Sequence, residues 1–200
     1  LMSRYDAIYK GDPTQKVVYL TFDNGYENGF TESILDTLKA ENVPATFFLT
    51  GHYLKSATPL VQRMVADGHI IGNHSYNHPN MAKLSDEEIL KEWQLFDEKL
   101  KELTKVNRTY YARPPEGIYN ERVLKIGIEN NYRHIFWSIA FKDWDRNSTL
   151  PASYAYDALM KQLHPGAIIL MHSVARHNAE ALPQFIKDAK AKGYTFASLD

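Results

Sequence analysis

Cysteine is absent from the 200-residue sequence. This absence excludes disulfides, thiolate metal ligands and a catalytic thiol, and it says nothing about the cellular compartment. The sequence also lacks an excess of charge of one sign, because it has 23 Lys and Arg residues and 24 Asp and Glu residues. The chain therefore has no electrostatic signature of nucleic-acid or anionic-membrane binding, and we expect no nucleic-acid partner.

Long apolar runs are missing as well. No stretch reaches the roughly 18 apolar residues of a membrane-spanning helix, and Leu1 to Arg4 contain no apolar core of the signal type. Linkers, internal repeats and low-complexity segments are not found either. With an ordinary hydrophobic share of 44%, the sequence predicts one domain over residues 1–200.

The segment "VVYLTFDNGYENG", Val17 to Gly29, permits two interpretations. Its Asn-Gly step is a strong hairpin signal, whereas Asp23 at the end of an apolar run suits a catalytic carboxylate. A hairpin needs a second alternating strand, but residues 31–42 have helical apolar spacing and "ATFFL" at 45–49 follows as a buried strand. The order strand, helix, strand argues against the hairpin.

The same alternation continues to the end of the chain. Strands are predicted at 17–23, 45–49, 69–73, 109–113, 134–140, 166–172 and 194–198. Helices are predicted at 31–42, 59–67, 85–103, 120–131, 153–163 and 178–192. Ser85 and Glu88 predict a capping box at the start of the longest helix.

Seven apolar strands separated by helices indicate an α/β fold with a parallel sheet. A doubly wound sheet and a closed barrel both fit this pattern. Polar, reactive residues follow the strands, and they are Asp23, His74, Arg113, Asp143 and His172. In a barrel these strand ends converge on one face, whereas an open sheet spreads them along an edge.

"HSYNHP" places His74 and His78 four residues apart, a spacing that suits a pair of metal ligands. Two polar histidines in a surface loop are the ordinary alternative. Asp23 alone could cap a helix, Arg113 could be a surface cation, and His172 could be a core histidine. Their shared position at strand ends argues against coincidence.

Five motifs in sequence carry a resemblance to a known family. They are "TFDNG", "HSYNH", "RPPEG", "WSIAFKDW" and "IILMH". They resemble, in order, the T-F-D-D-G, H-[ST]-x-x-H, R-x-P, D-W and L-x-H motifs of the polysaccharide deacetylases of carbohydrate esterase family four. The resemblance covers nearly the whole chain. It implies a distorted, incomplete (β/α) barrel of about seven parallel strands.

Within that family, the Asp-Asn pair with "GYENG" beside it is similar to the spore-cortex δ-lactam-forming de-N-acetylases. Those enzymes remove the acetyl group from muramic acid residues of peptidoglycan. The resemblance therefore implies a hydrolase of sporulation that acts on peptidoglycan glycan strands. It also implies an extracytoplasmic location, in the cell wall or the spore cortex, and we expect a monomer.

The resemblance also assigns roles to individual residues. Asp23 would be the general base and His172 the general acid. Arg113 would pair with Asp23, and Asp143 with His172, which would widen the pH range in which base and acid hold opposite protonation states. The residues implied to hold a divalent metal such as zinc are His74, His78 and Asn24, and those implied to bind substrate are Trp144, Tyr119, Glu27 and Arg176.

The chain departs from the family pattern at two positions. Asn24 stands where the family has a metal-binding Asp, so we expect weak metal binding. A site completed by Asp23 or Glu27, and catalysis with little metal, remain alternatives. Ala140 replaces the first acidic residue of the D-x-x-D-W segment.

Muramic acid carries a lactyl carboxylate that glucosamine lacks, and a nearby cation would favour its selection. Arg146 and Arg176 are candidates for that cation, and an ordinary surface position is the alternative for both.

Competing functions follow from the same residues. Deacetylation of N-acetylglucosamine in peptidoglycan or chitin-like polymers, or of O-acetyl groups in xylan, is a second enzymatic interpretation. A non-catalytic glycan-binding module is a third; Asn24 supports it and the retained Asp23 and His172 oppose it. A sugar-phosphate barrel would need a Gly-rich loop after its last strands, and only "KGYTF" occurs there, with its Gly before the strand.

Overall fold

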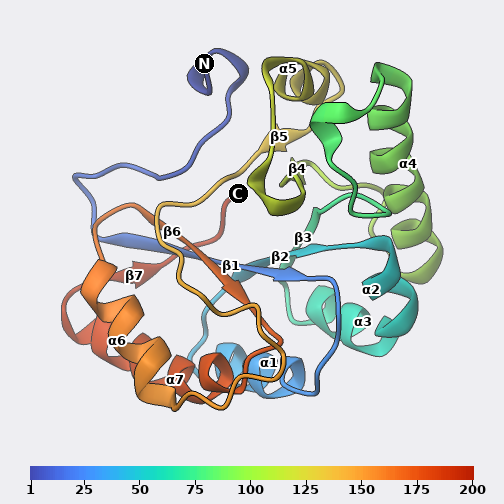
Figure 1. Cartoon of the computed structure of the whole chain (residues 1–200). Coiled ribbons are helices and arrows are strands. Elements are labelled where there is room, and N and C mark those ends of the chain that lie inside the picture. The colour runs from blue at the N-terminus through green and yellow to red at the C-terminus, as the bar shows by residue number, and fades with distance from the viewer.

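The computed structural model describes residues 1–200 and has a parallel sheet through its middle with helices packed around it (Figure 1). The strands are β1 (Val17–Asn24), β2 (Ala45–Leu49), β3 (Ile70–Asn73), β4 (Tyr111–Ala112), β5 (Arg133–His134), β6 (Ala167–His172) and β7 (Thr195–Phe196). The helices are α1 (Thr31–Ala40), α2 (Gly51–Ser56), α3 (Thr58–Ala66), α4 (Asp86–Leu103), α5 (Glu121–Glu129), α6 (Ala152–Gln162) and α7 (Arg176–Ala191). Short 3-10 turns are η1 (Ser3–Tyr5), η2 (Met81–Lys83) and η3 (Pro115–Gly117).

The sheet curls round until the segment after β5 reaches β6, and this decides between the two predicted architectures. Its strand order is β5-β4-β3-β2-β1-β6, and β7 pairs with the start of β1. After β5 the chain crosses to the free side of β6, where Ile139 bridges Ile169 in parallel. The sheet is therefore a distorted, incomplete (β/α) barrel, as predicted.

This closure also corrects the predicted strand over residues 134–140. His134 belongs to β5 beside β4, whereas Ile139 lies beside β6. The segment therefore divides into two short pairings, one with β4 and one with β6. The predictions for 109–113 and 194–198 shorten to the two-residue strands β4 and β7.

The main core lies between the central strands and the surrounding helices. It is a cluster of 29 buried residues, in which Phe22 of β1 and Phe47 of β2 stack at 5.0 Å. Every residue of β2 is buried, as expected for a parallel strand covered on both faces. This packing holds the carboxyl ends of β1, β2 and β6 in fixed positions.

Helix ends follow the signals in the sequence where those signals are strong. Ser85 and Glu88 form the predicted capping box of α4, and the Asn120 side chain accepts from the Val123 N–H at the start of α5.

Helix α2 is not predicted, because its six residues show no amphipathic period. The Thr50 side chain caps it by accepting from the Tyr53 N–H.

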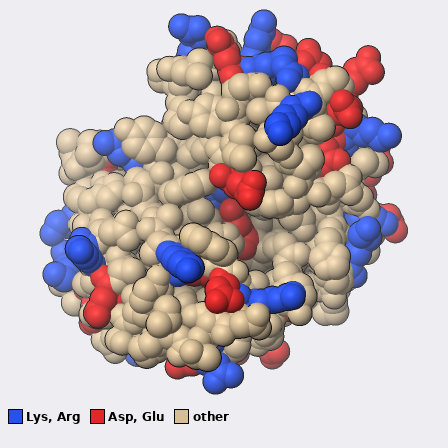
Figure 2. All heavy atoms as spheres, viewed as in Figure 1, with Lys and Arg blue, Asp and Glu red and all other residues tan.

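The surface carries both charges. Figure 2 shows Lys and Arg interspersed with Asp and Glu over a largely uncharged face, in keeping with the net charge of −1. No helix has the length and apolar character that crossing a membrane requires.

Candidate active site

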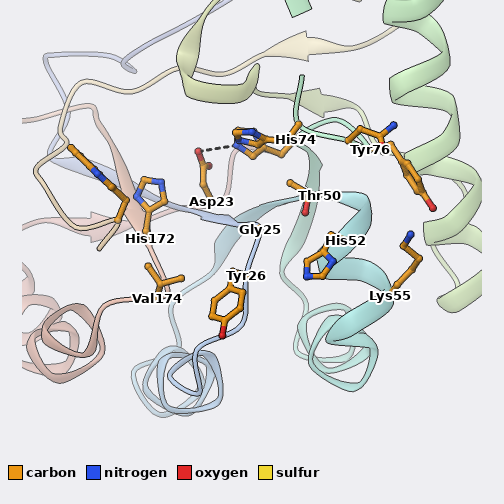
Figure 3. Close-up of a pocket in the computed structure, with 13 residues that line it drawn as sticks. Asp23, Gly25, Tyr26, Thr50, His52, Lys55, His74, Tyr76, His172 and Val174 are labelled. Atoms are coloured by element: carbon orange, nitrogen blue, oxygen red, sulfur yellow. Dashed lines mark ion pairs between the residues drawn. The ribbon is translucent and has the colours of Figure 1, made fainter. Parts of the chain in front are cut away.

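The reactive residues that follow separate strands come together at the carboxyl ends of the barrel strands. Asp23 of β1 and His172 of β6 are register partners on adjacent strands. His74 directly follows β3, and Arg113 directly follows β4. Asp23, His74 and His172 line one cavity of about 470 Å³ (Figure 3). The convergence expected of a barrel is confirmed.

Arg113 anchors Asp23 in a fixed orientation. Its Nη1 donates to Asp23 Oδ1 at 2.9 Å and to Thr21 Oγ1 at 2.8 Å. Its Nε and Nη2 donate to the backbone carbonyls of Ile135 and Phe136. The guanidinium is fully buried, and the Asp23 carboxylate and these other acceptors offset the cost of burying its charge.

The pKa of Asp23 is lowered in this environment. Burial alone would raise it, but the interactions with His74 and with the Arg113 guanidinium outweigh burial. Burial lowers the pKa of His74 itself, so that imidazole is neutral near pH 7. Arg113, which is always charged, is therefore the partner that keeps the Asp23 carboxylate ionised at neutral pH.

Asp143 holds His172. Asp143 Oδ1 lies 2.8 Å from His172 Nδ1, and Oδ2 accepts from the His172 backbone N–H at 2.8 Å. Asn178 Nδ2 donates to the same Oδ2 at 2.7 Å. Burial opposes charge on the imidazole, but the hydrogen bond and the charge of Asp143 outweigh it and raise the pKa of His172. The Nε2 atom is left free for chemistry.

The histidine pair, His74 and His78, presents imidazole nitrogens of the type that bind a divalent metal. His74 Nδ1 lies 2.8 Å from the Arg113 carbonyl oxygen, so it carries the proton and leaves the Nε2 lone pair available. A ligand histidine is commonly oriented by such a bond. Nε2 is 3.6 Å from Asp23 Oδ2, and the His74 and His78 ring centroids are 5.0 Å apart. The two imidazoles are the kind of donor that a divalent cation takes, with the Asp23 carboxylate beside them.

Asn24 does not complete this set as expected. Its side chain is fully buried, its Oδ1 accepts from Ser173 Oγ at 2.8 Å, and it does not line the cavity. Successive side chains of a strand point to opposite faces, which separates Asn24 from Asp23. No cluster of three or more His, Asp or Glu side chains has the geometry of a metal-ligand set.

Of the four residues expected to bind substrate, only Trp144 lines the cavity. Its ring centroid is 6.4 Å from that of His172. Tyr119 packs on Phe136 at 4.8 Å, away from this cavity. The Glu27 carboxylate accepts hydrogen bonds from the hydroxyls of Thr31 and Tyr53. Neither residue lines the cavity, so their roles in substrate binding stay predictions.

Arg176 is the fourth. Its side chain is 70% exposed and lies 3.9 Å from Glu180, and it does not line the cavity. A residue at the start of α7 faces solvent there, so its closeness in sequence to His172 does not bring it to the site. The Arg146 guanidinium lies over the Tyr26 ring at 4.7 Å and also remains outside the cavity.

Other residues at the site were missed from the sequence. His52 and Lys55 line the same cavity, but they lie on α2, which is too short to be recognised from the sequence. Tyr76 also lines it. A second cavity of about 440 Å³ shares Asp23 and His172 and adds Glu116, Trp137 and Leu170. Tyr76, Glu116, Trp137 and Leu170 lie inside the five family motifs, so those motifs could have indicated them.

Comparison with known proteins identifies the family. The sequence pattern described as polysaccharide deacetylase matches residues 10–135. The chain belongs to this family. It is therefore a polysaccharide deacetylase, with the strand-end cavity in the place where the barrel gathers its reactive side chains.

Three relatives bear on the function of this polysaccharide deacetylase. The peptidoglycan-N-acetylmuramic acid deacetylase PdaA of Bacillus subtilis is 48% identical over all of this chain and 76% of its own length. Its solved structure superposes with a TM-score of 0.96, covering 100% of this chain and 85% of that one. A peptidoglycan-N-acetylglucosamine deacetylase of Bacillus cereus is 35% identical over 99% of this chain and 72% of its own length.

The third relative is a carbohydrate esterase family 4 pseudoenzyme from Bacillus anthracis. It is 33% identical, with a TM-score of 0.89, and the match covers 96% of this chain and 67% of that one. This family thus contains proteins described as active on two different sugars and one described as a pseudoenzyme. The choice among them depends on the residues of the site.

Proposed function

We propose that this polysaccharide deacetylase hydrolyses the N-acetyl group of muramic acid residues in peptidoglycan glycan strands. The observation that carries the proposal is a carboxylate and an imidazole that line one cavity, each paired with a residue of opposite charge. Asp23 is held by Arg113, and His172 is held by Asp143. The 48% identity to the muramic acid deacetylase PdaA over the whole chain supports the sugar.

Asp23 and His172 divide the proton transfers of amide hydrolysis. The Asp23 carboxylate takes a proton from a water molecule, whose oxygen attacks the acetyl carbonyl carbon and forms a tetrahedral intermediate. His172, protonated on Nε2, gives that proton to the sugar nitrogen as the C–N bond breaks. The products are acetate and a free amine. That amine can condense with the lactyl carboxyl of the same sugar, with loss of water, to give the δ-lactam.

The charge partners make this division workable near neutral pH. The base must be ionised while the acid is protonated, and the lowered pKa of Asp23 and the raised pKa of His172 extend the range where both hold. Trp144 and Leu170, which line the second cavity beside His172, offer an apolar surface for the acetyl methyl group.

A divalent metal would be held by His74 and His78 next to Asp23. When bound, it would polarise the acetyl carbonyl and acidify the water. Only two imidazoles and one carboxylate that is already paired with Arg113 face it, so we propose weak binding. Asn24 would have to leave Ser173 in order to contribute.

Calorimetric titration with zinc tests this metal site. We expect weak binding to the wild-type chain, loss of binding in His78→Ala, and tighter binding in Asn24→Asp, because a carboxylate adds charge. Intact-mass analysis must accompany the titration, since deamidation at Asn24-Gly25 would itself produce Asp. If wild-type protein whose mass shows no deamidation binds zinc as tightly as Asn24→Asp does, the proposal of a weak site is contradicted.

The proposed substrate places the protein outside the cytoplasm, at the cell wall. Formation of muramic δ-lactam would place it in the spore cortex during sporulation. Both follow from the proposed chemistry together with the resemblance of the Asp-Asn motif, and peptidoglycan glycan strands are the proposed partner.

Product analysis on peptidoglycan glycan strands tests the function. Strands with and without stem peptides are incubated with the chain, with and without chelator and added zinc, and the digested sugars are analysed by mass spectrometry. We expect loss of acetyl from muramic residues. Deacetylation of glucosamine alone would contradict the sugar assignment, and no turnover under any condition would support a glycan-binding module instead.

A further inference from the structure

The reacting groups lie between two cavities that carry opposite charges. We name as the first lobe the cavity that contains Lys55, and as the second lobe the cavity that contains Glu116. The side chains common to both lobes are Asp23, His74, His78, Trp144 and His172. A sugar presented to Asp23 and His172 therefore extends into one lobe or the other.

Lys55 is the only Lys or Arg that lines the first lobe. Figure 3 shows it on α2, across the cavity from His172, with Asp23 between them. Its Nζ lies 5.0 Å from the Tyr76 ring centroid, a cation–π distance. Tyr76 is itself fixed, because a Cβ at Gly51 would come within 2.3 Å of its ring. The ammonium thus has a defined place at the cavity wall.

The second lobe has no Lys or Arg, and Glu116 is its only carboxylate besides Asp23. Glu116 adopts a left-handed backbone conformation, with φ of 58°, which is uncommon for a residue other than glycine. Neighbouring contacts must stabilise this conformation. The Gly117 N–H donates to the Pro114 carbonyl at 3.0 Å and closes the turn. An anion entering this lobe meets like charge.

We propose that this asymmetry orients muramic acid, with Lys55 binding its lactyl carboxylate and Glu116 excluding that carboxylate from the second lobe. The inference rests on the proposed function and deepens it. The lactyl ether is on C3 of the sugar, next to the acetamide-bearing C2, so the carboxylate lies beside the reacting amide. Lys55 replaces Arg146 and Arg176 as the selecting cation, because neither arginine lines the cavity.

The test compares two substrates that differ only in charge. Both are muramic-containing strands without stem peptides, one with the free lactyl carboxylate and one with it converted to the primary amide. Lys55→Gln is expected to lower kcat/KM about fivefold on the acid, the size of an exposed ion pair, and to leave the amide unchanged. Glu116→Gln is expected to raise kcat/KM on the acid and not on the amide.

Two further variants control for side effects. Lys55→Arg keeps the charge and should retain the preference for the acid, whereas Lys91→Gln removes an exposed lysine of α4 outside both lobes and should change nothing. Equal losses on acid and amide in Lys55→Gln, or no loss on either, would overturn the inference and leave the function intact. A wild-type chain that deacetylates neither substrate would reject both.

Discussion

At the scale of single residues, the site consists of two charged groups, each fixed by an opposite charge. Removing Arg113 would leave Asp23 buried and unpaired, and breaking a buried pair in this way typically costs about 3–5 kcal/mol. Removing Asp143 acts differently, because His172 is less buried, with its side chain 26% exposed. Removal of Asp143 would change the protonation and the orientation of the His172 imidazole.

Asp143→Asn is expected to move the alkaline limb of the kcat/KM profile to lower pH. His172 must be protonated to act as the acid, so activity falls above its pKa, and Asp143 is what raises that pKa. We also expect a loss in rate of about 10²-fold or more, as for an impaired general acid. The profile is measured by acetate release across pH.

Asp145→Asn is the matched control. Asp145 is exposed, two residues away, and its Oδ1 accepts from the Asn147 N–H, a role that an amide oxygen can also fill. Its profile should match the wild type. An Asp143→Asn profile with an unchanged alkaline limb would contradict the assignment of that limb to His172.

At the scale of elements, strong local signals predicted most of the structure. Central strands, long helices and the α4 capping box follow from apolar period and capping residues. The split of residues 134–140 depends on tertiary packing, namely the pairing of Ile139 with β6. Helix α2 has only six residues and a local Thr50 cap, too little for an apolar period. Lys55 was therefore not predictable as a cavity residue, whereas Asp23 and His172 were, since they lie at the carboxyl ends of strands.

Ser85→Ala is expected to destabilise the protein by about 1 kcal/mol, the usual cost of an N-cap loss. The Ser85 side chain accepts from the Glu88 N–H at 3.2 Å, and Glu88 accepts from the Ser85 N–H at 3.0 Å. Urea unfolding measures the change, with exposed Lys91→Ala in the same helix as the control. A change below that of the control would show that the capping box does not stabilise α4.

At the scale of the whole molecule, buried histidines make stability depend on pH. Burial lowers the pKa of His69 and His74, and it lowers the pKa of His134 to about 4. His134 Nε2 has no hydrogen-bond partner, so no contact favours its charged form. His172 acts in the opposite sense, because its pKa is raised.

We expect the free energy of unfolding to fall as pH drops below about 6.5, the unfolded-state pKa of histidine. Between that value and the folded pKa of about 4, the unfolded state binds a proton that folded His134 does not, and this costs roughly 3 kcal/mol in total. Urea unfolding at several pH values measures the slope. His134→Phe should flatten it, and exposed His52→Gln should not; equal slopes in all three proteins would contradict the account.

The central claim is that Asp23 and His172 act on one sugar from a shared cavity, and initial rates of acetate release from muramic-containing strands test it most directly. Asp23→Asn and His172→Gln should each lower kcat by about 10²–10⁴-fold, and the double variant should lose little more than either alone, since the two residues act as a unit. Both single variants should still bind the strands. An Asp23→Asn protein that turns over at the wild-type rate would contradict the claim.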